Sequence, residues 1–99
     1  MVARIATYSY TGDAQELGKR AEAGILPILK EQAGFRSYSV AIGEDKVFSS
    51  SAWDSRAEAE AGSAAVASWV AENMSEISLV GDVQYAEVAF STSLGVSTA

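Results

Sequence analysis

The residues of this chain that could take part in chemistry are its tyrosines, tryptophans and arginines. The 99 residues include no histidine and no cysteine, which excludes imidazole bases, Ser-His-Asp triads, histidine-ligated metals and thiolate nucleophiles. Proton transfer would therefore fall to Asp, Glu, Tyr or Lys. No two carboxylates have a spacing that demands a metal, and we expect the protein to use neither a metal nor a cofactor.

Six side chains are candidates for substrate binding, because aromatic rings and guanidinium groups can contact a ligand. Arg4 and Arg36 occupy predicted strands, where an inward charge must be paired or serve a ligand and an outward charge is ordinary. Tyrosines in strands more often serve packing or an interface. Trp53 ends a strand before a capped helix, so we assign it to packing. The candidates are Trp69, Tyr38, Arg36, Tyr85, Arg4 and Tyr8.

The periodicity of the sequence predicts the elements that position these side chains. Two-residue alternation predicts strands, and apolar residues at three- and four-residue steps predict helices. Gly43 begins a polar turn between the two central strands, and Gly81-Asp82 separates the second helix from the last strand. The predicted strands are 2–10, 35–42, 47–53 and 83–90, and the predicted helices are 14–32 and 56–74.

Cap residues predict where both helices begin. Asp13 precedes the first helix, and Ser55 with Glu58 three residues later fits a capping box before the second. Gly34 can take the left-handed conformation that closes the first helix. Within that helix, Pro27 predicts a kink or a separate last turn, and Gly18 and Gly24 predict close packing against the sheet.

The element order β-α-β-β-α-β predicts an α+β, ferredoxin-like fold, with two helices on one face of a four-stranded antiparallel sheet. The expected domain covers 1–90, and 91–99 forms a tail. Both faces of the sheet contain apolar residues, which predicts that a partner sheet in a homodimer covers the second face. A pocket between helix and sheet fits best where the second helix changes from small to bulky residues. For Trp69, packing and cavity-lining roles stay open, and the small Ser49, Ser50 and Ser51 leave room for a ligand or for the partner's side chains.

Composition excludes several kinds of partner. Thirteen acidic against seven basic residues give a net charge of −6, which disfavours nucleic acid and anionic membrane surfaces. No apolar run approaches the roughly 20 residues of a membrane span, and no signal pattern precedes the first strand. We therefore expect a cytoplasmic protein.

Three stretches, ILPILKEQAGFRSY, SSAWDS and ASWVAENM, resemble the antibiotic biosynthesis monooxygenase-like branch of the dimeric α+β barrel superfamily. The resemblance covers nearly the whole chain except its last eight or nine residues. This branch includes cofactor-independent oxygenases of polycyclic phenols, quinol oxygenases, haem-degrading enzymes and proteins without known activity. Haem-degrading members use a strand-1 asparagine, a helix-2 tryptophan and a histidine near the end of that helix. The first strand here has no asparagine, and the other two positions fall near Gly62 and Glu72, so haem degradation is disfavoured.

The resemblance implies a cofactor-independent monooxygenase that acts on a small aromatic phenol, quinol or polyketide compound. In such chemistry the deprotonated substrate gives an electron to dioxygen, and the protein binds the anion, aids proton removal and excludes water. The alternative is a non-catalytic dimeric α+β barrel that binds a small hydrophobic ligand or acts structurally. A third reading is an isomerase or cyclase of aromatic polyketides, which would use acid–base chemistry without oxygen.

Overall fold

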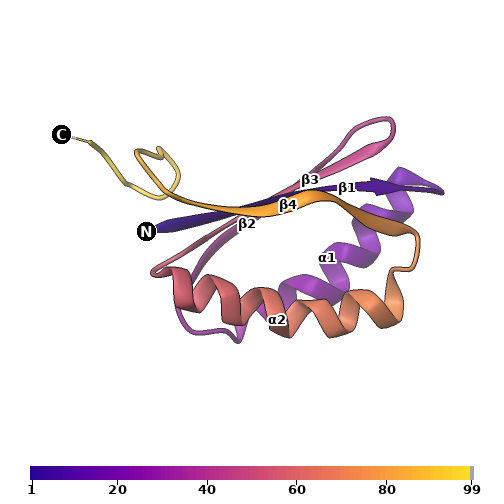
Figure 1. The fold of residues 1–99 in the computed structure, drawn as a ribbon, viewed down its shortest axis with the longest axis horizontal. Coiled ribbons are helices and arrows are strands. Elements are labelled where there is room, and N and C mark those ends of the chain that lie inside the picture. The colour runs from indigo at the N-terminus through magenta and orange to yellow at the C-terminus, as the bar shows by residue number, and fades with distance from the viewer. Residues whose placement is uncertain (99) are drawn as a thin grey trace.

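The computed structural model describes residues 1–98 and shows a four-stranded antiparallel sheet with both helices on one face (Figure 1). The strands lie in the order β2-β3-β1-β4. This arrangement confirms the predicted ferredoxin-like β-α-β-β-α-β fold. The elements are β1 (Val2–Tyr10), α1 (Ala14–Lys30), β2 (Phe35–Ile42), β3 (Lys46–Trp53), α2 (Arg56–Asn73) and β4 (Ile77–Glu87).

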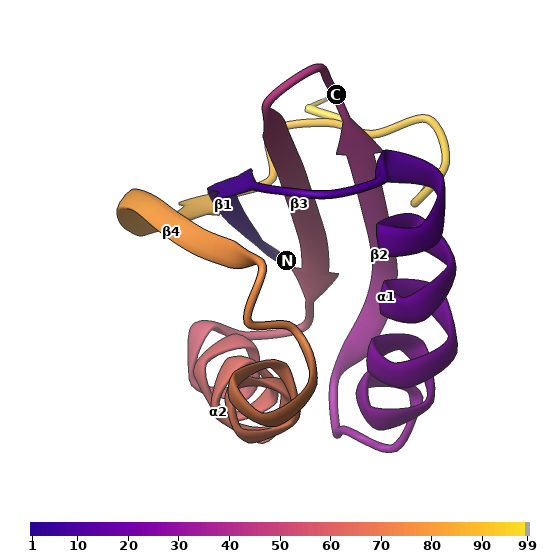
Figure 2. The same cartoon turned by 90° about the vertical axis from the view of Figure 1, so that its right-hand side faces the viewer.

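The two helices cover different parts of the sheet. Figure 2 shows α1 running along β2, whereas α2 lies on the other side of the helical layer. The buried apolar side chains of α1 and the fully buried ring of Trp53, at the end of β3, form the core between helices and sheet.

The helix boundaries follow the predicted caps. The Asp13 side chain accepts hydrogen bonds from the backbone N–H groups of Gln15 (2.8 Å) and Glu16 (3.4 Å). Ser55 accepts one from the Glu58 N–H (3.2 Å), while its own hydroxyl donates to the Glu58 carboxylate (2.9 Å). The glutamate therefore closes the cap through the serine hydroxyl rather than through the cap amide that the capping box predicts. Gly34 has a φ of +78°, as its place after α1 predicts.

The last strand differs from its prediction. It runs over Ile77–Glu87, not 83–90, and Gly81-Asp82 lies inside it instead of before it. The register slips at this point: Ile5 pairs with Gln84, but Thr7 pairs with Val80, so β4 holds extra residues opposite Ala6. A bulge of this kind tolerates glycine at positive φ, and Gly81 has a φ of +70°. The glycine that suggests a loop in the sequence is a strand irregularity.

Two details of α1 also differ from expectation. The helix ends at Lys30 rather than at residue 32, and it continues through Pro27 without a separate last turn. Close packing of Gly24 is confirmed, but the neighbour is the Trp69 ring of α2 and not the sheet. Glycine in α1 thus allows the two helices to approach each other.

The outer face of the sheet, opposite the helices, carries small and apolar side chains. Its exposed hydrophobic side chains include Ile5 at 45%, Phe48 at 52% and Val80 at 44% of their accessible surface. Beyond β4 the chain curls to this side (Figure 1) and closes a turn through two backbone hydrogen bonds between Ser91 and Val96. No helix within residues 1–98 is long and apolar enough to cross a membrane.

Candidate functional site

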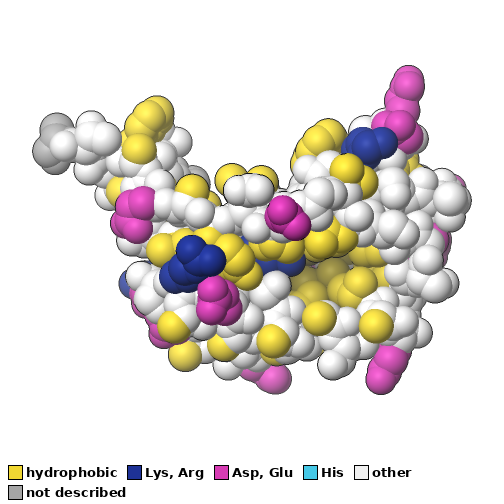
Figure 3. Space-filling model, viewed as in Figure 1, with side chains coloured by type: hydrophobic (Ala, Val, Ile, Leu, Met, Phe, Trp, Pro, Cys, Tyr) yellow, Lys and Arg dark blue, Asp and Glu magenta, His cyan; other side chains and the backbone are white. Residues whose placement is uncertain are grey.

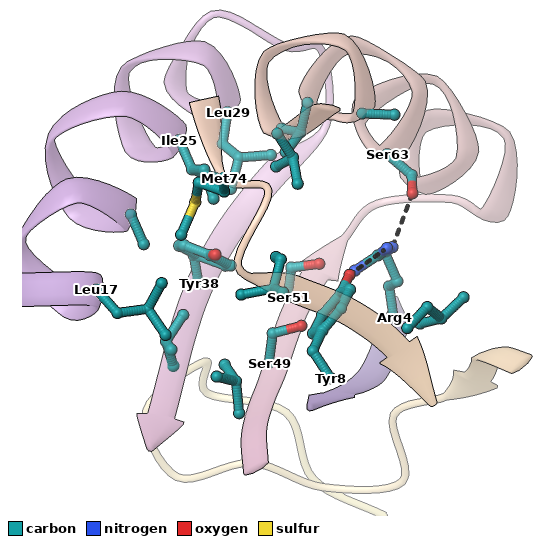
Figure 4. Close-up of a pocket in the computed structure, with 18 of the residues that line it drawn as sticks. Arg4, Tyr8, Leu17, Ile25, Leu29, Tyr38, Ser49, Ser51, Ser63 and Met74 are labelled. Atoms are coloured by element: carbon teal, nitrogen blue, oxygen red, sulfur yellow. Dashed lines mark hydrogen bonds between the residues drawn. The ribbon is translucent and has the colours of Figure 1, made fainter. Parts of the chain in front are cut away.

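A cavity of about 320 Å³ lies between the sheet and the two helices. Its floor comes from the helix-facing sides of β1, β2 and β3, and its walls come from α1 and α2, as the close-up shows (Figure 4). Figure 3 shows a hollow lined with hydrophobic side chains between α2 and β4. A ligand could therefore enter from that side without a change of fold.

The cavity has room above the sheet because two small, buried serines lie at the centre of its floor. Ser49 and Ser51 each expose only 6% of their surface and face the helices from β3. Neighbouring strands place larger side chains beside them, since Ser51 pairs with both Arg4 and Tyr38 in the register. Directly opposed residues share a face of the sheet. The row Arg4–Ser51–Tyr38 therefore has a gap at its middle, which is open to the cavity.

Arg4 brings a positive charge to one end of the cavity. Its Nε donates to the Ser63 Oγ of α2 at 2.9 Å, and its Nη2 donates to the Tyr8 hydroxyl at 3.3 Å (Figure 4). Both partners are neutral. Among residues 1–98, no carboxylate lies within ion-pair distance of this guanidinium.

Tyr38 lies across the serine floor from Arg4 and points its hydroxyl toward the cavity (Figure 4). Burial raises the pKa of Tyr38 to about 12; the nearby Tyr8 adds to the rise and Arg4 opposes it. Tyr38 is therefore protonated throughout the neutral range. Its hydroxyl is a hydrogen-bond donor for a ligand oxygen and not a general base.

The other end of the cavity is apolar. Ile25 and Leu29 of α1 meet Met74, which follows α2, on the side of Tyr38 away from Arg4 (Figure 4). These side chains bury nearly all of their own surface. The cavity thus has a cationic end and a hydrocarbon end, which suits a ligand with one polar edge.

The structure brings together three of the six predicted binding residues: Arg4, Tyr8 and Tyr38 all line the cavity. Arg36 lies outside it, half exposed and bonded to Asp54 at 2.6 Å. Trp69 and Tyr85 also lie outside the cavity lining. Trp69 packs on Gly24. Tyr85 pairs with Arg4 in the strand register, and the guanidinium carbon of Arg56 lies 4.8 Å from the centre of its ring.

Trp53 and Ser63 complete the site in ways that the sequence only partly indicates. Trp53 is fully buried and forms a cavity wall, with its indole N–H bonded to the Ser51 hydroxyl at 2.8 Å. A Cβ at Gly62 would overlap its ring, so the glycine of α2 makes the space for the tryptophan. Ser63 holds Arg4 in place. In the sequence, Ser63 stands out only as a polar residue among the alanines of the second helix.

The described residues hold no cluster of three or more Asp, Glu, His or Cys side chains that could bind a metal ion. Without a histidine in the sequence, a haem iron would also lack the imidazole ligand that the haem-degrading branch members use. The cavity itself offers the guanidinium of Arg4, tyrosine and serine hydroxyls, and an apolar enclosure.

Comparison with solved structures places this fold among known proteins. No protein-family model matches the sequence, and no curated protein sequence matches it. SnoaB, a cofactor-independent oxygenase from Streptomyces nogalater, superposes with a TM-score of 0.72 at 9% identity over 92% of this chain and 95% of its own. A putative antibiotic biosynthesis monooxygenase from Chloroflexus aurantiacus J-10-fl gives 0.63 at 18% identity, over 96% of this chain and 100% of its own.

MupZ from Pseudomonas fluorescens gives a TM-score of 0.69 at 12% identity over 85% of this chain, which spans 63% of MupZ. The structural neighbours of the present protein are thus antibiotic biosynthesis monooxygenase-like proteins, and the resemblance expected from the sequence is confirmed. TM-scores of 0.63 and 0.72 at identities of 18% and 9% establish a shared ferredoxin-like fold. They leave the reaction to be argued from the site itself.

Proposed function

We propose that this protein is a cofactor-independent monooxygenase that acts on a small aromatic phenol, quinol or polyketide compound. The observation that supports this most is the cavity itself, an apolar enclosure with a hydroxyl donor and a guanidinium at its edge. Cofactor-free oxygenation asks little more of a protein than to hold an electron-rich ring, stabilise its anion and exclude water. The likeness to SnoaB in fold is consistent with this chemistry.

The reaction balances without a bound cofactor. The ionised ring transfers one electron to dioxygen, and the two radicals combine into a peroxide on a ring carbon that bears hydrogen. One oxygen atom stays as the new carbonyl, and the other leaves as water with two protons. The electrons come from the substrate alone. Arg4 would stabilise the ring anion, and the protonated Tyr38 would donate a hydrogen bond to an oxygen of the bound ring or peroxide.

Oxygen uptake tests this proposal. Purified protein with 1,8-dihydroxyanthrone in an oxygen electrode, in the presence of a chelator, should consume one O₂ per quinone formed, faster than the autoxidation blank. With ¹⁸O₂, the product should contain one labelled oxygen. Uptake no faster than the blank, with the ligand shown to bind, would favour the non-catalytic ligand-binding protein. Product formed without oxygen would favour the isomerase or cyclase.

A matched pair of variants shows whether the cavity is responsible. Ser49→Leu fills the buried floor, whereas Ser68→Leu adds the same side chain to an exposed position of α2 outside the cavity. The first should abolish uptake above the blank and the second should retain it, with circular dichroism confirming that both are folded. Equal activity in the two would remove the cavity from the mechanism.

We further propose that the protein is a homodimer joined through the outer faces of its two sheets. Ile5, Phe48 and Val80 lie close together on that face because Phe48 and Val80 both pair with Thr7 of β1. Three large apolar side chains so placed on a half-exposed sheet favour a partner of the same kind. A second copy would close the sheet on itself and leave the cavities on the two outer, helical sides.

A further inference from the structure

We propose that the ligand of this cavity is an aromatic anion, and that Arg4 is the residue that selects it. This inference rests on the proposed function only in placing the substrate in the same cavity. It adds that Arg4 makes binding selective for the anion and sets the orientation of the ligand, and it holds equally for a protein that binds such a ligand without oxidising it.

The charge of Arg4 is uncompensated. A guanidinium has five N–H donors, and in residues 1–98 two of them are used, on the neutral oxygens of Ser63 and Tyr8. A partly buried cation without an anionic partner is costly, and a ligand anion would remove that cost. The other three arginines, Arg20, Arg36 and Arg56, each have a carboxylate partner.

The geometry holds the guanidinium ready for such a ligand. Ser63 binds Nε from α2, and Tyr8 binds Nη2 from the same strand as Arg4, so the planar group is fixed from two sides (Figure 4). The remaining donors belong to Nη1 and Nη2, at a side chain that lines the cavity. Paired terminal N–H groups match the two oxygens of a carboxylate or the oxygens of an ionised hydroxyquinone.

The rest of the cavity determines what the anionic group is attached to. Ile25, Leu29 and Met74 form the end away from Arg4 and offer only hydrocarbon and thioether surface. The volume of about 320 Å³ is roughly twice that of the engineered apolar cavity that holds benzene. This volume and lining suit an apolar system of two or three rings with an anionic oxygen at one edge.

Calorimetric titration with matched naphthalene probes tests this assignment. 2-Naphthoate offers a carboxylate, 2-naphthamide is its neutral isostere, and a nitronaphthol that is ionised at pH 7.5 offers a phenolate. The wild-type protein should bind the two anions about tenfold to a hundredfold more tightly than the amide, as a charged hydrogen-bond pair predicts. The anion that binds more tightly identifies the natural headgroup.

Arg4→Gln should bring naphthoate binding within about twofold of naphthamide binding, because the positive charge is lost, and it should lower the amide affinity far less than the naphthoate affinity. Arg56→Gln removes an equal charge from an exposed ion pair outside the cavity and should keep the preference for the anion. Retained amide binding shows that the cavity is intact. If Arg4→Gln does not fold, Arg4→Lys supplies the test through a weaker preference for the planar carboxylate.

The proposal is overturned if the wild-type protein binds amide and anions equally, or if Arg4→Gln retains the preference. Selective anion binding without oxygen uptake from dihydroxyanthrone would overturn the oxygenase assignment and leave this inference standing. Oxygen uptake without selectivity for anions would do the reverse.

Discussion

At the scale of single residues, the site depends on one row of side chains that crosses the sheet. Arg4 on β1, Ser51 on β3 and Tyr38 on β2 are neighbours in the register and face the helices together. The small middle residue matters as much as its two larger neighbours, since a larger side chain there would fill the space between the cation and the hydroxyl. Ser51 is also held in place by the indole N–H of Trp53.

The raised pKa of Tyr38 gives a direct spectroscopic prediction. Titration at 295 nm should show one tyrosine ionising near pH 12, well above the ordinary 10.0. Because burial disfavours the tyrosinate, the folded protein retains this proton while the unfolded chain loses it. The stabilisation linked to Tyr38 is therefore complete below pH 10 and is lost as the pH rises toward 12.

Tyr38→Phe should remove this late ionisation and flatten the fall in unfolding free energy over the same pH window. Tyr10→Phe is the matched control, since the Tyr10 hydroxyl bonds the exposed backbone carbonyls of Gly43 and Glu44 outside the cavity. Loss of the late phase in the control variant, and not in Tyr38→Phe, would contradict the assignment.

At the scale of elements, substitution by alanine should change the stability of the protein differently at three helical glycines. Alanine at a helical glycine usually stabilises by up to about 1 kcal/mol. Gly18→Ala should do so, because its Cβ would meet only the tip of Ile42 at an ordinary 3.5 Å. Gly62→Ala should instead cost about 1–3 kcal/mol, since its Cβ would overlap the ring of the fully buried Trp53.

Gly24→Ala should fall between these two, because Trp69 is only partly buried and its ring can move aside. Urea unfolding of the three variants measures the order of stability directly. Stabilisation by Gly62→Ala would show that Trp53 and α2 are not packed as described.

How far the sequence predicts this fold depends on where each signal comes from. Caps and periodicity are local, so Asp13 and Ser55 mark the starts of their helices correctly, and Gly34 takes the expected positive φ although α1 already ends at Lys30. Gly81 misleads because a positive φ looks the same in a loop and in a strand bulge, and only the pairing with β1 tells them apart. Gly24 likewise indicates close packing without naming its neighbour, which lies on the other helix.

The site is less predictable than the fold for the same reason. Residue type singles out Arg4, Tyr8 and Tyr38, which line the cavity, but it equally singles out Arg36, which bonds Asp54 on the surface. Which tyrosines and arginines share a cavity depends on strand register and on which face meets the helices. Neither is encoded locally, and the role of Ser63 depends on both.

At the scale of the whole molecule, the two faces of the sheet differ in shape. The helical face contains the cavity, and the opposite face is concave between the C-terminal segment and the β2–β3 turn (Figure 3). We expect a second copy to occupy that concave face. This arrangement would let two cavities work independently in one dimer.

Ile5→Lys should weaken the dimer by about tenfold or more, because it would bury a charge between the two sheets. Ala61→Lys introduces the same charge on the exposed surface of α2 and should leave association unchanged. Sedimentation velocity at micromolar concentrations measures both. A wild-type protein that sediments as a monomer would contradict the proposed interface.

The central claim is that the cavity beneath the sheet receives an aromatic anion at Arg4, and a crystal structure with 2-naphthoate tests it most directly. We predict the carboxylate within hydrogen-bond distance of the Arg4 guanidinium and the rings against Leu29 and Met74. A second hollow lies between α1 and β2, with Lys19 at its rim. Naphthoate bound there, or an apolar cavity left empty at saturating ligand, would contradict the claim.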